Sequence, residues 1–145
     1  MKHKTGLFFL ALVPLLFAPS FPAPAQETGQ TPSPPEEKAL TLTRAAVCEE
    51  IHDLAPKNEG VVFSTARGKI VCFTAFDPVP NRMFVYHQWY RRDEPIARVR
   101  LTLNPPRWST YSTIQLRESD KGPWRVEIRG KAGRVYGVLR FSITD

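Results

Sequence analysis

The sequence predicts an all-β protein, an antiparallel β-sandwich of immunoglobulin-like type built from seven to nine short strands. Three observations support this prediction. Strand-like runs recur about every ten residues through the second two-thirds of the chain. Turn signals rich in Pro, Gly, Asn and Asp separate these runs. Several runs alternate apolar with polar residues, which is typical of antiparallel strands that cover a core on one side.

The N-terminal segment, residues 1–25, has the pattern of a secretory signal peptide. Lys2 and Lys4 provide a basic start, an apolar stretch follows, and Ala23-Pro24-Ala25 forms a small-residue cleavage site. The apolar stretch is shorter than the roughly 20 residues that span a bilayer. We therefore expect cleavage before Gln26 and a periplasmic or secreted bacterial protein. The alternative is an uncleaved signal, which would be the protein's contact with a membrane.

Residues 26–38 are rich in Pro, Glu, Thr and Gln and contain no large apolar side chain. Such a segment cannot bury enough surface to offset its chain entropy, so it predicts a disordered linker. The remaining residues, 39–145, have the size of one domain. We expect them to form a single β-sandwich.

Eight runs have strand character. In order they span Leu40 to Ile51, Gly60 to Ser64, Lys69 to Phe76, Arg82 to Arg91, Ile96 to Leu103, Trp108 to Ser112, Trp124 to Arg129 and Val135 to Ile143. The end of the first run is also compatible with a helical turn. Ala66-Arg67-Gly68 predicts a hairpin turn, with Gly68 supplying a positive φ. In the seventh run Trp124 shares a face with Val126 and Ile128, so we expect its indole in the core.

The charge of the chain favours an anionic partner. The whole chain carries 20 basic and 14 acidic residues, and loss of Lys2 and Lys4 with the signal peptide leaves 18 basic residues against the same 14 acids. This excess is too small for a nucleic-acid-binding surface, and an exported protein would rarely meet nucleic acid.

The two cysteines, Cys48 and Cys72, predict one disulfide, because an even pair in a small exported domain is typical of an oxidised framework. Two free buried thiols, or half of a metal site, are the alternatives. No Cys-x-x-Cys or His-x-x-x-His spacing accompanies them, so we expect neither a metal nor a cofactor.

Four motifs carry a family resemblance. They are His-Gln-Trp-Tyr at 87–90, Arg-Trp-Ser-Thr-Tyr-Ser at 107–112, Gly-Pro-Trp-Arg-Val-Glu at 122–127 and the closing Gly-Val-Leu-Arg-Phe at 137–141. Together they resemble the bacterial family called domain of unknown function 2914, from about Ala45 to Ile143. The resemblance implies a compact β-domain of exported or membrane-tethered proteins and no established chemistry.

His87 is the one attractive catalytic residue of the domain. As a general base it would need a hydroxyl, such as Ser109 or Ser112, and an orienting carboxylate. No nucleophile-elbow motif is present. His87 also shares a strand face with Trp89, and packing in the core is the competing interpretation. A small hydrolase that uses His87 as general base is therefore the alternative function.

We expect instead a non-catalytic binding or interaction module of the cell envelope. Aromatic side chains beside arginines on a sheet face are suited to stacking on sugars and to bidentate contacts with anions. The candidate ligand-binding residues are His87, Trp89, Tyr90, Arg107, Trp108 and Tyr111. The expected partner is an anionic polysaccharide or an envelope protein.

Overall fold

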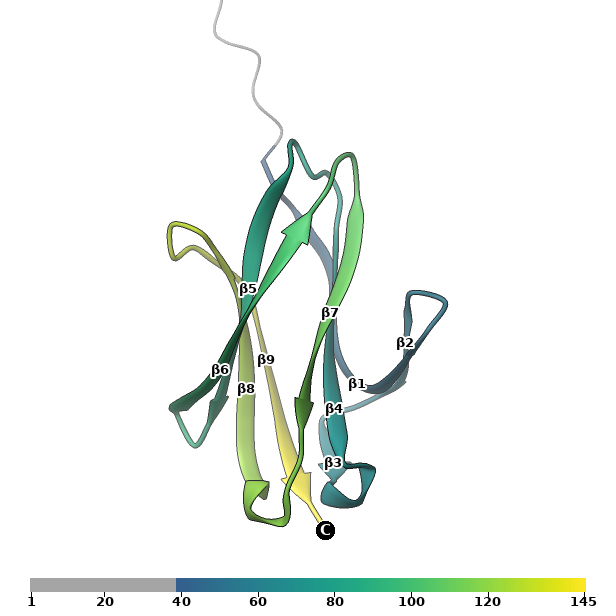
Figure 1. Ribbon diagram of the computed structural model, residues 1–145, viewed down its shortest axis with the longest axis vertical. Helices are drawn as coiled ribbons and strands as arrows, with labels where there is room; N and C mark the ends of the chain where they lie inside the picture. The colour runs from purple at the N-terminus through teal and green to yellow at the C-terminus, as the bar shows by residue number, and fades with distance from the viewer. Residues whose placement is uncertain (1–38) are drawn as a thin grey trace, which may run out of the picture. The chain divides into compact units, whose positions relative to one another are not determined.

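The computed structural model describes residues 39–145, which form two β-sheets packed face to face (Figure 1). Sheet A has the strand order β2 (Ala55–Glu59), β1 (Leu42–His52), β4 (Lys69–Phe76) and β7 (Trp108–Gln115). Sheet B has the order β3 (Val62–Ser64), β9 (Val135–Thr144), β8 (Gly122–Gly130), β5 (Met83–Arg91) and β6 (Glu94–Leu103). The predicted signal peptide and linker lie outside the described residues. Within residues 39–145 no helix is long and apolar enough to cross a membrane.

The predicted β-sandwich is confirmed, and each of the eight predicted strands is present. The sequence missed β2, because its five residues, Ala-Pro-Lys-Asn-Glu, show no alternation and contain a proline. This strand forms because Asp53 and Leu54 adopt positive φ values and turn the chain back on β1. The extension of β1 is therefore a strand and not a helical turn.

The expected hairpin between the second and third predicted strands is wrong. Gly68 has the positive φ of 69° that the turn prediction required, but β3 and β4 lie in different sheets. A 3₁₀ turn at Thr65–Arg67 carries the chain from one sheet to the other, and β3 pairs in parallel with β9. Phe63 anchors it by packing edge-on against Phe141, with ring centroids 6.1 Å apart.

The disulfide prediction is also wrong, because Cys48 and Cys72 are free thiols. The two residues do lie on neighbouring strands, but the register pairs Cys72 with Val47 and Cys48 with Val71. Opposed residues project to the same face of a sheet and consecutive residues to opposite faces. The two sulfurs therefore lie on opposite faces of sheet A. Cys72 belongs to the core cluster between the sheets.

Aromatic rings fill one end of the core. Phe141 stacks on Trp124 with ring centroids 6.2 Å apart and meets Trp89 edge-on at 6.2 Å. Trp124 is 4% exposed, and its indole N–H donates to the carbonyl oxygen of Asp120 at 2.7 Å. The sequence-based placement of Trp124 in the core is confirmed. The acceptor belongs to a short 3₁₀ turn, Glu118–Asp120, just before β8, and not to a neighbouring strand.

Replacement of Trp124 by alanine should lower the free energy of unfolding by about 3–5 kcal/mol, because it removes a buried indole and leaves a cavity. Urea unfolding measures this cost. The control is Leu54→Ala, since Leu54 is an apolar side chain that is 67% exposed. It should change stability by less than about 0.5 kcal/mol. Equal costs for the two variants would contradict the assignment of the core.

The thiols should react with an alkylating reagent only after denaturation. Both cysteines are buried, and burial raises the pKa of both thiols, which disfavours the reactive thiolate. Mass spectrometry should find the native protein unmodified and the urea-unfolded protein with two added groups. A chain that adds no group after denaturation without reductant would contain the disulfide after all.

Candidate functional site

A hydrogen-bonded polar cluster lies in the middle of the core and joins the two sheets. His87, from β5 of sheet B, is 0% exposed. Its Nε2 lies 3.1 Å from Oγ1 of Thr74 on β4, and its Nδ1 lies 2.8 Å from Oγ of Ser112 on β7. The indole N–H of Trp89 donates to the same Ser112 oxygen at 3.1 Å.

The His87 imidazole is neutral in the folded protein. Burial lowers its pKa from 6.5 to about 4, because the charged ring would lose its hydration. A neutral ring satisfies the whole cluster: Ser112 accepts from Trp89 and donates to Nδ1, while Nε2 donates to Thr74. In residues 39–145 no buried side-chain polar atom lacks a partner.

This environment excludes the hydrolase hypothesis based on His87. A general base needs access to a substrate and a carboxylate that orients the ring. His87 has neither, since its ring contacts two hydroxyl groups and is closed off from solvent. The competing interpretation, that His87 packs in the core with Trp89, is confirmed.

The six predicted ligand-binding residues do not form one site. His87 and Trp89 are fully buried and face no surface, so including them in a binding surface was wrong. Tyr90 lies on the outer face of sheet B, where the guanidinium of Arg125 covers its ring. The remaining three, Arg107, Trp108 and Tyr111, lie on or beside β7 of sheet A and are exposed.

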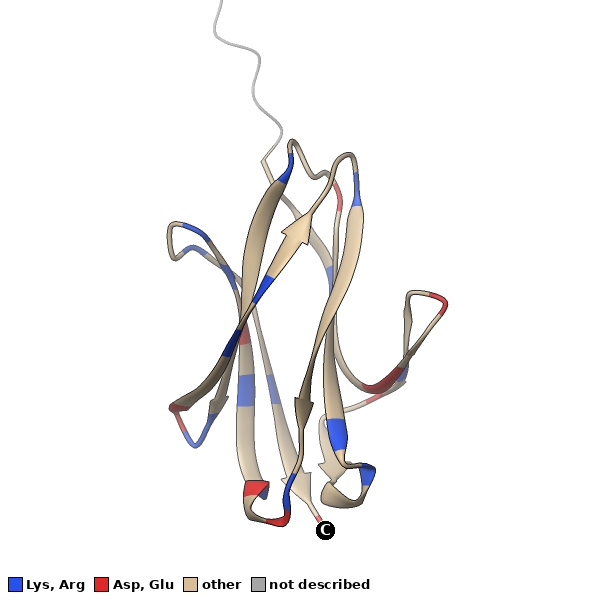
Figure 2. Cartoon of the chain, viewed as in Figure 1, with Lys and Arg blue, Asp and Glu red and all other residues tan. Residues whose placement is uncertain are grey.

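The outer face of sheet B carries arginines stacked on aromatic rings. Arg98 lies 3.7 Å from the ring centroid of Tyr86, and Arg100 lies 3.9 Å from that of Phe84. Each of these arginines of β6 leans over a diagonal neighbour on β5 and not over the residue directly opposite it. Figure 2 shows basic positions along β6 and β8 of this sheet. We name this surface the arginine–aromatic face and define it by Phe84, Tyr86, Tyr90, Arg98, Arg100 and Arg125.

Two carboxylates contact this surface: Asp93, in the turn before β6, pairs with Arg125, and Glu127 lies on β8. Arg125 Nε donates to Glu127 at 3.0 Å and Arg129 Nη2 at 2.5 Å. Burial opposes the charged form of Glu127, but the hydrogen bonds from both arginines outweigh it and hold the pKa of the carboxyl below its ordinary value. Within the described residues Arg98 and Arg100 have no acidic partner. They are free to contact an anion.

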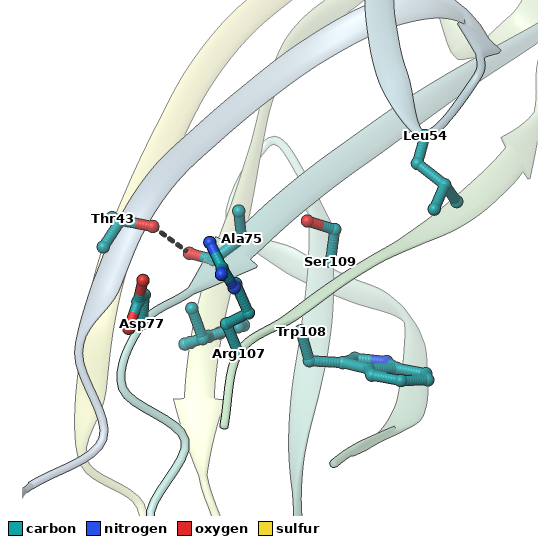
Figure 3. A pocket seen from close by; sticks show the side chains of 8 residues that line it. Thr43, Leu54, Ala75, Asp77, Arg107, Trp108 and Ser109 are labelled. Carbon is teal, nitrogen blue, oxygen red and sulfur yellow. Dashed lines mark hydrogen bonds between the residues drawn. The ribbon is translucent and has the colours of Figure 1, made fainter. Parts of the chain in front are cut away.

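A separate open pocket of about 490 Å³ lies on sheet A (Figure 3). Arg107, Trp108 and Ser109 at the start of β7 contribute to its lining. Leu54, at the tip of the β1–β2 hairpin, contributes from the far end. Figure 3 shows the side chains of Trp108 and Ser109 on opposite sides of β7, and 40% of Trp108 is exposed. The pocket brings together two predicted site residues, Arg107 and Trp108.

The prediction missed most of the arginine–aromatic face, although the alternation of β5 contains the signal. Val85, His87 and Trp89 project inward, so the intervening residues of the strand must project outward. The pattern identifies those outward residues as Phe84, Tyr86, Gln88 and Tyr90. Which arginines cover them depends on strand pairing, and the sequence does not specify pairing. Among the described residues no group of three His, Cys, Asp or Glu side chains is placed to hold a metal ion.

Comparison with known proteins supports the family and the fold. The model of a family described as "Protein of unknown function (DUF2914)" matches residues 83–143. This match covers β5 to β9, and it makes that part of the chain similar to the family. The resemblance inferred from the four motifs is thereby confirmed for β5 to β9, and the family's description assigns no chemistry. No curated protein matches the chain.

Two solved structures show how far the fold likeness extends. An immunoglobulin-like protein from Pseudomonas aeruginosa superposes with a TM-score of 0.52 at 8% sequence identity, over 76% of this chain and 100% of that chain. This likeness shows an immunoglobulin-like fold alone. A β-glucosidase of family GH3 from Bifidobacterium adolescentis gives a TM-score of 0.41 at 11% identity, over 72% of this chain and 17% of that chain. That TM-score is too low to indicate a shared fold.

Acid should destabilise the folded protein through His87. Above its ordinary pKa of 6.5 the ring is neutral in both the folded and the unfolded chain. As the pH falls toward 4, the unfolded chain binds a proton that the folded protein does not. The free energy of unfolding should therefore fall over this window, by up to about 3 kcal/mol near pH 4.

Urea unfolding as a function of pH, followed by tryptophan fluorescence, measures this loss. The variant His87→Gln keeps a polar group and should lose this part of the pH dependence while being less stable at neutral pH. The exposed His52 provides the control, because His52→Gln should retain the full dependence. If the His87 variant kept the wild-type dependence of the free energy of unfolding on pH, the assignment of His87 as a neutral buried ring would be wrong.

Proposed function

We propose that this protein is an exported, non-catalytic binding module that holds an acidic polysaccharide on its arginine–aromatic face. The observation that carries the proposal is the pair of stacked arginines, Arg98 and Arg100, on an outer sheet face and without an acidic partner among the described residues. The family and the fold are compatible with such a module.

Stacking prepares each guanidinium for binding. A ring such as Tyr86 covers one flat side of Arg98, and the N–H groups at the edge of the guanidinium remain available. A carboxylate accepts two parallel hydrogen bonds from this edge. Because the ring already limits the motion of the arginine, less conformational entropy is lost on binding.

The shape of the surface favours a polymer over a small molecule. The arginine–aromatic face extends over three neighbouring strands, β6, β5 and β8, on a sheet whose strands lie about 4.8 Å apart. Small ligands usually occupy concave, enclosed sites. An extended chain with repeated carboxylates would contact Arg98 and Arg100 in succession, and its sugar rings would lie against the edges of half-buried aromatic rings.

Export supports a polysaccharide as the partner. The signal-peptide pattern of residues 1–25 predicts a location in the cell envelope or outside the cell, where acidic polysaccharides are plentiful and nucleic acids are rare. The basic excess of the chain acts in the same direction, because it draws polyanions toward the surface.

Purified protein should bind polygalacturonate and not neutral dextran in isothermal titration calorimetry. The affinity should fall as salt is added, because the contacts are ionic. The double variant Arg98→Gln/Arg100→Gln should bind at least about tenfold more weakly, the equivalent of 1.4 kcal/mol. Both arginines are exposed, so the variant should remain folded.

The matched control is Arg107→Gln, which removes an exposed arginine from sheet A. It should bind polygalacturonate like the wild type. A loss of binding in this variant would move the site to the sheet A pocket. Absence of binding to every acidic polysaccharide tested would remove the proposed partner.

A further inference from the structure

The four sheet edges differ in how they are protected against pairing with another strand. Natural proteins protect edges with short strands, prolines and charges. On sheet B, β3 has three residues, and β6 contains Pro95 and two arginines. On sheet A, β2 has five residues, including Pro56 and Lys57. The remaining edge, β7, has eight residues without a charge or a proline, and Figure 2 shows it uncharged along its length.

The backbone of β7 offers hydrogen bonds outward. The N–H of Leu116 donates to the carbonyl of Gly68 on the β4 side at 2.9 Å, and the register continues without a break from Gln115 to Trp108. In an antiparallel ladder, bonded and non-bonded residue pairs alternate. The N–H and C=O groups that point away from β4 therefore belong to Ser109, Tyr111, Thr113 and Gln115.

We propose that β7 pairs with β7 of a second copy of this chain, antiparallel and around a two-fold axis at Tyr111, so that the two copies of sheet A become one eight-stranded sheet. A perpendicular two-fold axis requires opposed residues to share a sheet face. Centring on Tyr111 satisfies this, since Ser109 then lies opposite Thr113 of the second copy and both residues offer outward backbone groups. The pairing joins two tyrosines and two sets of hydroxyl side chains, combinations that stabilise antiparallel pairs.

The exposed indole of Trp108 also favours pairing through β7, because it can fill a pocket of the second copy. In this register Trp108 lies opposite Ile114 of the second copy. Ile114 lines an open pocket of about 420 Å³ at the edge of the sandwich, together with Ile96 and Ala97 of β6. Charged side chains complete its rim, those of Arg91, Arg117 and Asp120, and an arginine can stack on an indole ring. Trp108 is 40% exposed and shares the inward face of β7 with Ile114. Each indole would enter the pocket of the other copy and lose its exposure to water.

The charge distribution favours a second copy as the occupant. After loss of the predicted signal peptide each copy carries 18 basic and 14 acidic residues, so two copies repel each other over most of their surface. Within β7 there is no charge, so this strand can meet its own copy without like charges directly opposite. Because the other edge of sheet A, β2, is short and charged, pairing stops at a closed dimer and does not continue into a filament.

Cysteine cross-linking tests the register directly. Two Tyr111→Cys residues would face each other at the axis with Cα atoms about 5.5 Å apart, within the range of about 4.4–6.8 Å that a disulfide spans. Mild oxidation should give a covalent dimer. The native cysteines are buried and do not compete. Thr102→Cys, an exposed position on the β6 edge, is the matched control and should stay monomeric on denaturing gels.

Sedimentation equilibrium of the uncross-linked protein tests the energetics. Tyr111→Lys places two like charges opposite each other and should weaken the dimer at least about tenfold. Trp108→Ala should weaken it similarly, while Thr102→Lys should leave it unchanged. The dissociation constant of the dimer should lie below about 0.1 mM. A wild-type protein that is still monomeric at this concentration overturns the proposal. So does a dimer that Tyr111→Lys leaves intact, or efficient cross-linking through Thr102→Cys.

Discussion

The hydrogen bonds around His87 connect the two sheets in a way that apolar packing alone does not. Thr74 and Ser112 come from sheet A, and His87 and Trp89 from sheet B. Apolar contacts tolerate small shifts between packed surfaces, whereas hydrogen bonds in a dry core tolerate few, because an unpaired buried polar group is costly. The cluster therefore fixes how β5 lies over β4 and β7. Because side chains alternate along a strand, the alignment of the inward residues also sets where the outward residues of these strands lie.

The same alignment determines which residues are available for function. Since the odd residues of β5 project into the core from Val85 to Trp89, its even residues face solvent and receive the arginines of β6 and β8. The strand that supplies the buried histidine thus also supplies the aromatic rings of the proposed binding face. A substitution in the polar cluster would shift the backbone of β5 and so move the aromatic rings of that face, although no side chain of the cluster reaches it.

The two proposed surfaces lie on different sheets and use different chemistry. The arginine–aromatic face is charged and belongs to sheet B, while the β7 edge is uncharged and belongs to sheet A. Pairing through β7 would leave the outer face of each sheet B uncovered by the partner strand. Two such faces in one dimer would bind a long polymer with greater avidity than one face, provided that the polymer spans both.

The sequence alone determined the β-class, most strand positions, the burial of Trp124 and the family resemblance, because these depend on local alternation, turn residues and short motifs. Only the tertiary structure decided the pairing. Nothing local distinguishes β3 beside β9 from β3 in a hairpin with β4, and a register offset of one residue separates Cys48 from Cys72. Strand pairing also explains why the predicted site residues are split between the core and the surface. His87 and Arg98 belong to adjacent strands, yet one is buried and the other is exposed, because strand pairing and side-chain parity assign them to opposite faces of sheet B.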